Sequence, residues 1–174
     1  MGVKDSIRVA GLCSILGVCG AAADPLELGK RIPRVEAQTH DGATVKLHET
    51  AAKGWTLVYF YPKASTPGCT KQACSLRDAN AALTEHGVRV FGVSRDSVAK
   101  QKAFAEAQGL PFLLVADVDG TVVKAFGVPG MGLTRLPSRQ AFLFRDGVLV
   151  WRDLKASTTK QAADVLEAIR AAGG

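Results

Sequence analysis

Residues that bind metals are scarce in this sequence of 174 residues, which has four cysteines and three histidines. A structural zinc site or an iron–sulfur cluster takes four ligands, usually cysteines and histidines at short spacings. The histidines at positions 40, 48 and 86 have no such spacing to one another or to the cysteines. We therefore expect no bound metal.

Long basic runs are also missing from the sequence. The formal net charge is +6, but the lysines and arginines are scattered, and aromatic residues make up only 6% of the chain. A nucleic-acid interface usually concentrates basic and aromatic residues on one surface. The charge therefore indicates a basic soluble surface, and we expect no nucleic-acid partner.

No apolar stretch reaches the length of a transmembrane helix, which is about 20 residues. The longest uncharged stretch is VAGLCSILGVCGAAA, at residues 9–23, and it follows Lys4 and Arg8. This pattern predicts a secretory signal peptide at residues 1–23, cleaved after Ala23 to give a periplasmic or secreted protein without membrane attachment. Two alternatives stay open: a lipid-anchored protein, attached at Cys19, and a cytoplasmic protein that retains this segment as a helix.

The remaining residues, 24–174, are expected to form a single domain, because 47% of the sequence is hydrophobic and can fill one core. Buried strands are predicted over 55–62, 88–94 and 111–117, with helices over 67–86, from the cap at Asp96-Ser97 to Gly109, over 120–126 and over 158–171. Hairpins are predicted over 35–49 and 139–152, with tight turns at Asp41-Gly42 and Asp146-Gly147. The alternation favours an α/β fold, a thioredoxin-like three-layer sandwich with an N-terminal β-hairpin extension.

Two cysteines lie close together in the segment YPKASTPGCTKQACSLRD, residues 61–78. Thr66 and Pro67 suit the cap and the first position of a helix, which places Cys69 in the first helical turn. Free backbone amides and the positive end of the helix dipole favour a thiolate there. The hydroxyl of Thr66 and a guanidinium from elsewhere in the chain could stabilise charge that develops during a reaction at this sulfur.

Cys74 follows five positions after Cys69 in the same predicted helix. Helical geometry separates their Cα atoms by roughly 8.7 Å, whereas a disulfide needs about 4.4–6.8 Å. The two cysteines can therefore pair only after the first turn or two of the helix unwinds. This spacing favours cysteines that react in sequence; inert buried cysteines, a strained structural disulfide and half of a metal site are the other interpretations.

The same segment resembles the active site of the peroxiredoxins, specifically the Q-type group that includes bacterioferritin comigratory protein. The superfamily pattern Pro-x-x-x-Thr-x-x-Cys is met by Pro62, Thr66 and Cys69, and Cys74 stands at the place of the second cysteine of the Q type. The stretch GVSRDSVAKQKAFAEAQGLPFLLVADVDGTVVKAFGV and the segment RQAFLF, which opens with Arg139, are also similar to this family. The resemblance extends over most of the chain after residue 28.

The resemblance implies a thiol-dependent peroxidase. Cys69 would attack hydrogen peroxide or an organic hydroperoxide and become a sulfenic acid, while Arg139 and Thr66 position the peroxide and Pro62 shields the pocket. Cys74 would resolve the sulfenic acid into an intramolecular disulfide, which a thioredoxin-like donor then reduces. No cofactor is needed, because the sulfur carries the redox change. The group also implies a monomer.

Two features depart from the family pattern, and three rival functions stay open. Gln72 stands where many relatives carry glutamate, and the export-like leader leaves the identity of the donor undetermined. A disulfide oxidoreductase would separate its cysteines by two residues, whereas four intervene here. A copper-binding assembly protein would need closer cysteines and a suitably placed histidine. A non-catalytic binding module would hold Arg139 away from Cys69.

Overall fold

The computed structural model describes residues 24–173, so the expected signal peptide at residues 1–23 lies outside the described part of the chain. The strands are β1 (Glu36–Thr39), β2 (Thr44–Lys46), β3 (Trp55–Phe60), β4 (Arg89–Ser94), β5 (Leu113–Ala116), β6 (Gln140–Arg145) and β7 (Val148–Asp153). The helices are α1 (Leu47–Thr50), α2 (Pro67–Asp78), α3 (Asn80–Glu85), α4 (Val98–Gln108), α5 (Thr121–Ala125) and α6 (Gln161–Ala171). None of these helices is long and apolar enough to cross a membrane.

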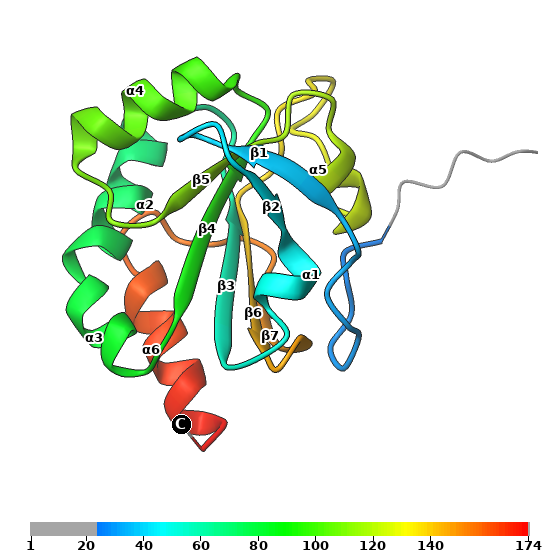
Figure 1. Ribbon diagram of the computed structural model, residues 1–174, viewed down its shortest axis with the longest axis vertical. Coiled ribbons are helices and arrows are strands. Elements are labelled where there is room, and N and C mark those ends of the chain that lie inside the picture. Colours follow the sequence, from blue (N-terminus) through cyan, green and yellow to red (C-terminus); the bar gives the residue numbers. More distant parts are fainter. Residues whose placement is uncertain (1–23, 174) are drawn as a thin grey trace, which may run out of the picture.

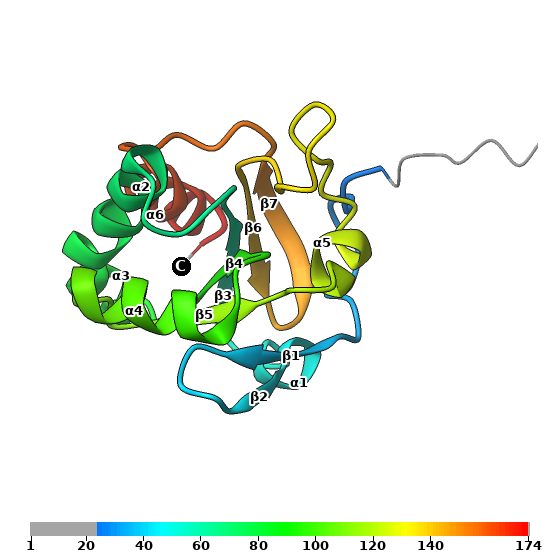
Figure 2. The same cartoon turned by 90° about the horizontal axis from the view of Figure 1, so that it is seen from above.

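One sheet of seven strands, in the order β2-β1-β5-β4-β3-β6-β7, forms the middle layer of the protein (Figure 1). β3, β4 and β5 pair in parallel, as the sequence predicts for its strand–helix–strand unit. Helices α2, α3, α4 and α6 cover one face of the sheet, and α1 and α5 lie on the other (Figure 2). The predicted three-layer α/β arrangement is confirmed.

Strand β3 is buried on both faces, which explains its nearly continuous apolar sequence, WTLVYF. Leu57 and Tyr59 pack in the core beneath α2, α3, α4 and α6, whereas Val58 and Phe60 pack in the core beneath α1 and α5. The parallel strands β3 and β4 lead into α2 and α4, so both helices begin at the carboxyl edge of the sheet. This edge carries the residues of the candidate site.

Antiparallel strands complete the sheet on both sides. The β1–β2 hairpin joins it through β5, and the β6–β7 hairpin joins it through β3. β7 lies at the end of the sheet, and residues 29–32 run along its outer side. There, the amide of Gly29 donates to the carbonyl of Leu149, and the amide of Leu149 donates back to the carbonyl of Lys30.

The helix predicted over 67–86 is divided in two, because Ala79 separates α2 from α3 with backbone angles of φ −91° and ψ 6°. Asp78 and Asn80 flank Ala79, and such side chains favour turns over helix interiors. The guanidinium of Arg77 pairs with Asp78 and also donates to the carbonyl of Gln108 at the end of α4. Tertiary contacts thus stabilise the break.

The first predicted hairpin differs from the structure in its turn and in its second strand. The loop between β1 and β2 has four residues, His40 to Ala43, and only Gly42 has a positive φ. The carboxylate of Asp41 accepts hydrogen bonds from Thr39 and Ala43, and the bond from Thr39 lowers the pKa of Asp41. β2 ends at Lys46, and the residues expected to continue it form α1, which buries Leu47 in the core.

The last helix, α6, begins at Gln161, three residues later than the predicted start at Thr158. The hydroxyl of Ser157 accepts hydrogen bonds from the amides of Thr159 and Lys160, which holds this segment in a turn. The second hairpin turns at Asp146 and Gly147, both of which have positive φ, and this turn is confirmed.

Candidate active site

The loop between β3 and α2 is fixed by a buried carboxylate at the end of β4. The backbone amide of Ala64 donates to Asp96 Oδ2 at 2.7 Å, and Ser94 Oγ donates to the same oxygen at 2.7 Å. The next residue, Ser65, has a left-handed backbone with φ 59°. The sequence predicted Asp96 and Ser97 as a helix cap, but only Ser97 caps α4. Asp96 therefore anchors the entry into α2.

Thr66 occupies the N-cap position of α2, and Pro67 follows as the first helical residue, as predicted. The hydroxyl of Thr66 does not cap the helix amides, which differs from the expected arrangement. It donates instead to the carbonyl of Lys63 at 2.9 Å and closes the loop on itself. The first amides of α2 consequently stay free of a side-chain cap, and they lie next to Cys69.

Cys69 is 2% exposed in the first turn of α2, and a guanidinium reaches its sulfur. Arg139 Nη2 donates to Cys69 Sγ at 3.5 Å. Arg139 directly precedes β6, whose first residue, Gln140, pairs with Phe60 at the end of β3. The guanidinium passes over Gly68, where a Cβ atom would lie 3.3 Å from Nη2. The start of α2 and the residue before β6, which are distant in sequence, thus come together at the Cys69 sulfur.

A chain of buried amides holds the other side of the guanidinium. Arg139 Nη1 donates to Gln72 Oε1, and Gln72 Nε2 donates to Oε1 of Gln161 at the start of α6. Gln72 is 0% exposed and Gln161 is 1% exposed. The Nε2 atom of Gln161 is buried and has no partner among the described residues. The orientation of Arg139 therefore depends on two helices.

Two buried tyrosines belong to the same core cluster as Cys69. Tyr59 and Tyr61 stack with ring centroids 5.6 Å apart, and the hydroxyl of Tyr61 donates to Gln101. Burial raises the pKa of both phenols far above the ordinary value. Both side chains are therefore neutral at physiological pH and add no negative charge near the sulfur.

The opening above Arg139 is a hollow of about 280 Å³ that Pro62 and Arg139 line together. Its other lining residues come from the loop before β6 and from the segment after β7, namely Met131, Ser138, Leu154, Lys155 and Ala156. Pro62 is partly exposed, and Met131 is 48% exposed. The hollow is large enough for a small molecule beside the guanidinium.

Cys74 lies about 1.4 turns further along the intact helix α2, and neither Cys69 nor Cys74 forms a disulfide. The sulfur of Cys74 lies 3.6 Å from Gln108 Oε1 of α4. Cys74 also lines an open groove with Lys71, Ser75, Asp78, Ala79 and Thr159. The two sulfurs therefore have different surroundings, and Cys74 is the more accessible of the two.

The structure brings Pro62, Cys69 and Arg139 together and leaves Cys74 apart, as the helix geometry requires. Sequence reasoning missed Gln161 completely, because it lies 89 positions from Gln72 and nothing in its neighbourhood indicates a contact with the site. Within residues 24–173, no three or more histidine, cysteine, aspartate or glutamate side chains are grouped as metal ligands would be.

Comparison with known proteins identifies the family. The sequence profile of the AhpC/TSA family matches residues 28–152. The chain is 34% identical to peroxiredoxin Bcp of Bacillus subtilis over 83% of this chain and 96% of that protein. It is 45% identical to peroxiredoxin Bcp of Escherichia coli over 62% of this chain and 68% of that protein. Its match to the chloroplastic peroxiredoxin Q of Triticum aestivum, at 40% identity, covers 72% of this chain and 56% of that protein.

Solved structures give the same answer for the fold. The peroxidoxin BcpB of Mycobacterium tuberculosis is similar with a TM-score of 0.77 and 31% identity, covering 84% of this chain and 97% of that chain. The bacterioferritin comigratory protein of Xanthomonas campestris also has a TM-score of 0.77, with 30% identity, covering 86% of this chain and 98% of that chain. These neighbours confirm the thioredoxin-like fold. The chain belongs to the AhpC/TSA family, in which its relatives are the Bcp and Q-type peroxiredoxins, and it is a thiol-dependent peroxidase.

Proposed function

We propose that Cys69 is the residue that reacts with peroxide. The observation that supports this role is the 3.5 Å contact between Arg139 Nη2 and the Cys69 sulfur in the buried first turn of α2. A thiolate at this position attacks the terminal oxygen of a peroxide ROOH, so that an S–O bond forms and the O–O bond breaks. The departing RO⁻ takes a proton and leaves as ROH, and Cys69 becomes a sulfenic acid.

Arg139 is the group best placed to assist this step. The positive charge of its guanidinium stabilises both the thiolate and the negative charge on the leaving oxygen. Thr66 holds the loop at the helix entrance through its bond to Lys63, and Pro62 lines the hollow beside Arg139. Pro62 and Thr66 therefore shape the site around Cys69 and Arg139.

Cys74 is the resolving cysteine in this proposal. Its thiolate attacks the sulfenic sulfur of Cys69, forms the disulfide and releases hydroxide, which becomes water. Because both residues lie in the intact helix α2, this step requires local unwinding of that helix. A thioredoxin-like dithiol donor then reduces the disulfide and regenerates both thiols.

The substrate range includes hydrogen peroxide and organic hydroperoxides. The structure of the Xanthomonas campestris relative was described in connection with alkyl peroxide reduction. Here, Met131 and Leu154 supply apolar surface to the hollow beside Arg139, which suits an alkyl substituent. No metal or organic cofactor takes part, because the two sulfurs carry all of the electrons.

The proposal also includes the place where the protein works. Residues 1–23 have the pattern of a signal peptide, so the mature chain is periplasmic or secreted, acts as a monomer and takes electrons from a thioredoxin-like donor in that compartment. N-terminal sequencing of the exported protein is expected to start at Asp24. Recovery of the intact N-terminus, in the cytoplasm only, would contradict this localisation.

Replacing Cys74 by serine tests the two-cysteine cycle. The Cys74→Ser variant is expected to complete one turnover with peroxide and then to stop cycling, because the sulfenic acid has no partner thiol. Mass spectrometry is expected to find one or more oxygen atoms added at Cys69 and no intramolecular disulfide. Continued turnover of this variant with a thioredoxin-like donor would show that Cys74 is not the resolving residue.

Replacing Gln72 by glutamate tests the electrostatic role of the amide chain. A carboxylate beside Arg139 offsets part of the positive charge that stabilises the thiolate, and the amide of Gln161 can donate to it. The rate of Cys69 oxidation by peroxide at neutral pH is therefore expected to fall by about three- to tenfold. Gln108→Glu is the matched control, because Gln108 contacts Cys74. An unchanged oxidation rate in Gln72→Glu would exclude this role.

A further inference from the structure

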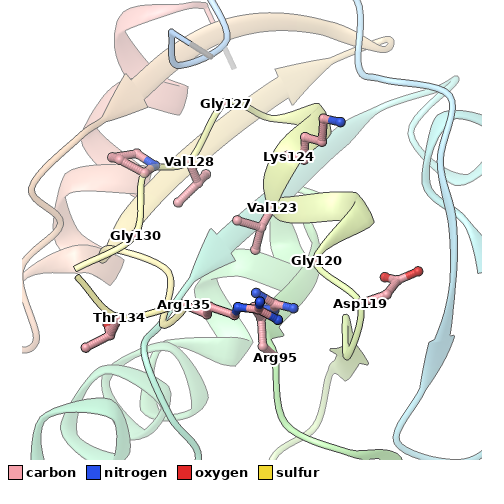
Figure 3. Close-up of a pocket in the computed structure, with 11 residues that line it drawn as sticks. Arg95, Asp119, Gly120, Val123, Lys124, Gly127, Val128, Gly130, Thr134 and Arg135 are labelled. Carbon is pink, nitrogen blue, oxygen red and sulfur yellow. The ribbon is translucent and has the colours of Figure 1, made fainter. Parts of the chain in front are cut away.

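A second hollow, of about 350 Å³, lies between α5 and the loop that leads to β6 (Figure 3). Its floor is formed by residues around the start of α5 and by Arg95, which follows β4, and its rim is formed by residues 127–130, 134 and 135. It shares no lining residue with the hollow that Pro62 and Arg139 line. The peroxidase mechanism therefore does not use it.

Positive charge dominates this second hollow. Arg95, Lys124 and Arg135 line it, and Asp119 is its only acidic lining residue. The guanidinium groups of Arg95 and Arg135 point into the space between α5 and the loop, whereas the carboxylate of Asp119 points away from them (Figure 3). Within residues 24–173, neither arginine forms an ion pair. Two like charges thus face one space, and neither has an ion-pair partner within the described residues.

The side chain of Arg95 is positioned by a backbone carbonyl, but not all of its N–H donors have a hydrogen-bond acceptor. Its Nη2 atom donates to the carbonyl of Val118 at 3.0 Å, and its Nε atom is buried without a partner among the described residues. The guanidinium packs against Gly120, where a Cβ atom would lie 3.1 Å from its central carbon. The positive φ of 83° at Gly120 also favours glycine. This geometry fixes a cation at the base of the hollow.

Arg135 comes from the opposite side, on an exposed loop that is closed by a hydrogen bond from the amide of Met131 to the carbonyl of Leu136. A surface arginine on such a loop can extend into solvent, yet this one turns toward Arg95 (Figure 3). Repulsion between like charges opposes that arrangement unless an anion lies between them. The convergence of the two side chains therefore indicates a ligand of opposite charge.

We propose that this hollow binds a phosphate group, either as inorganic phosphate or as the monoester of a small molecule. Three cations against one carboxylate leave a net charge of +2, which matches a phosphate dianion. Guanidinium groups donate two parallel hydrogen bonds to phosphate oxygens, and two of them can bind different oxygens of one group. Val123, Val128 and Pro129 supply apolar surface for the carbon portion of a monoester.

Titration of the reduced full chain, followed by NMR at constant ionic strength, tests the proposal. Inorganic phosphate or glycerol 3-phosphate is expected to cause saturable shifts at the amides of Gly120 and Gly130. Tighter binding of glycerol 3-phosphate would identify a monoester site, and tighter binding of phosphate would identify a site for the free ion. Absence of saturable shifts with both probes, or tighter binding of succinate than of either, would overturn the proposal.

Single substitutions distinguish specific phosphate binding in this hollow from nonspecific electrostatic attraction of phosphate to a basic protein. Arg95→Gln and Arg135→Gln are each expected to weaken binding about tenfold, the effect of losing one charged hydrogen bond. Arg170→Gln removes the same charge from the exposed surface of α6 and is expected to leave binding unchanged. Because Arg135 lies on an exposed loop, Arg135→Gln is expected to fold normally. This variant therefore tests the phosphate site even if Arg95→Gln folds poorly. Equal loss of phosphate affinity in Arg135→Gln and Arg170→Gln would refute the site. The peroxidase rate measured without phosphate is expected to be unchanged in both variants.

Discussion

The Cys69→Ser variant is expected to lose peroxide consumption by at least about a thousandfold, the largest effect of any single substitution in this protein. A serine hydroxyl is not ionised at neutral pH, and it forms no stable product equivalent to a sulfenic acid. The measurement is the rate of hydrogen peroxide loss with a thioredoxin-like donor, together with single-turnover oxidation monitored by mass spectrometry.

Serine is nearly isosteric with cysteine, so the fold is expected to persist in the Cys69→Ser variant. Circular dichroism and thermal unfolding check this point, and Cys74→Ser is the matched control, because it changes the other cysteine of α2 and retains the first turnover. If Cys69→Ser kept a substantial fraction of the activity, the reacting sulfur would have to be another one, and the contact with Arg139 would have no catalytic meaning.

Arg139→Gln is expected to reduce the rate of Cys69 oxidation by about 10²- to 10³-fold. The substitution removes the donor to the sulfur at 3.5 Å and the positive charge that stabilises the leaving oxygen. The measurement is the second-order rate constant for oxidation of the reduced protein by hydrogen peroxide, taken across pH.

Arg145→Gln is the matched control for Arg139→Gln, because Arg145 lies at the other end of β6, where it is exposed and packs over the ring of Trp55. It is expected to keep the oxidation rate while losing the same unit of charge. A rate for Arg139→Gln within threefold of that of Arg145→Gln would mean that the guanidinium holds structure near Cys69 without assisting its chemistry.

The parts of the fold that follow local rules could be predicted from the sequence. The buried run of β3, the Pro67 start of α2 and the Asp146-Gly147 turn each depend on residues within a few positions of one another. The approach of Arg139 to Cys69 was implied by resemblance, and the structure has this contact. The catalytic roles themselves remain predictions until the variants are measured.

The parts that were missed depend on contacts between distant residues. The break at Ala79 is stabilised by Arg77, which reaches α4, and the amide pair of Gln72 and Gln161 forms only when α6 folds against α2. Asp96 was interpreted as a cap because aspartate commonly caps helices, but the loop before α2 lies close enough to take its carboxylate. Propensity and spacing contain no information about such partners.

Residues 29–32, which run along the outer side of β7, determine whether a shortened form of the protein exposes the edge of its sheet. An uncovered terminal strand exposes a row of unpaired amides and carbonyls, to which a strand of another molecule can add. Residues 29–32 occupy part of that row, and Arg152 fastens the preceding backbone by donating to the carbonyls of Pro25 and Leu26. Cleavage after Ala23 would leave residues 29–32 paired with β7. A chain that began at Pro33 would expose the outer backbone groups of β7, and we expect it to aggregate through them.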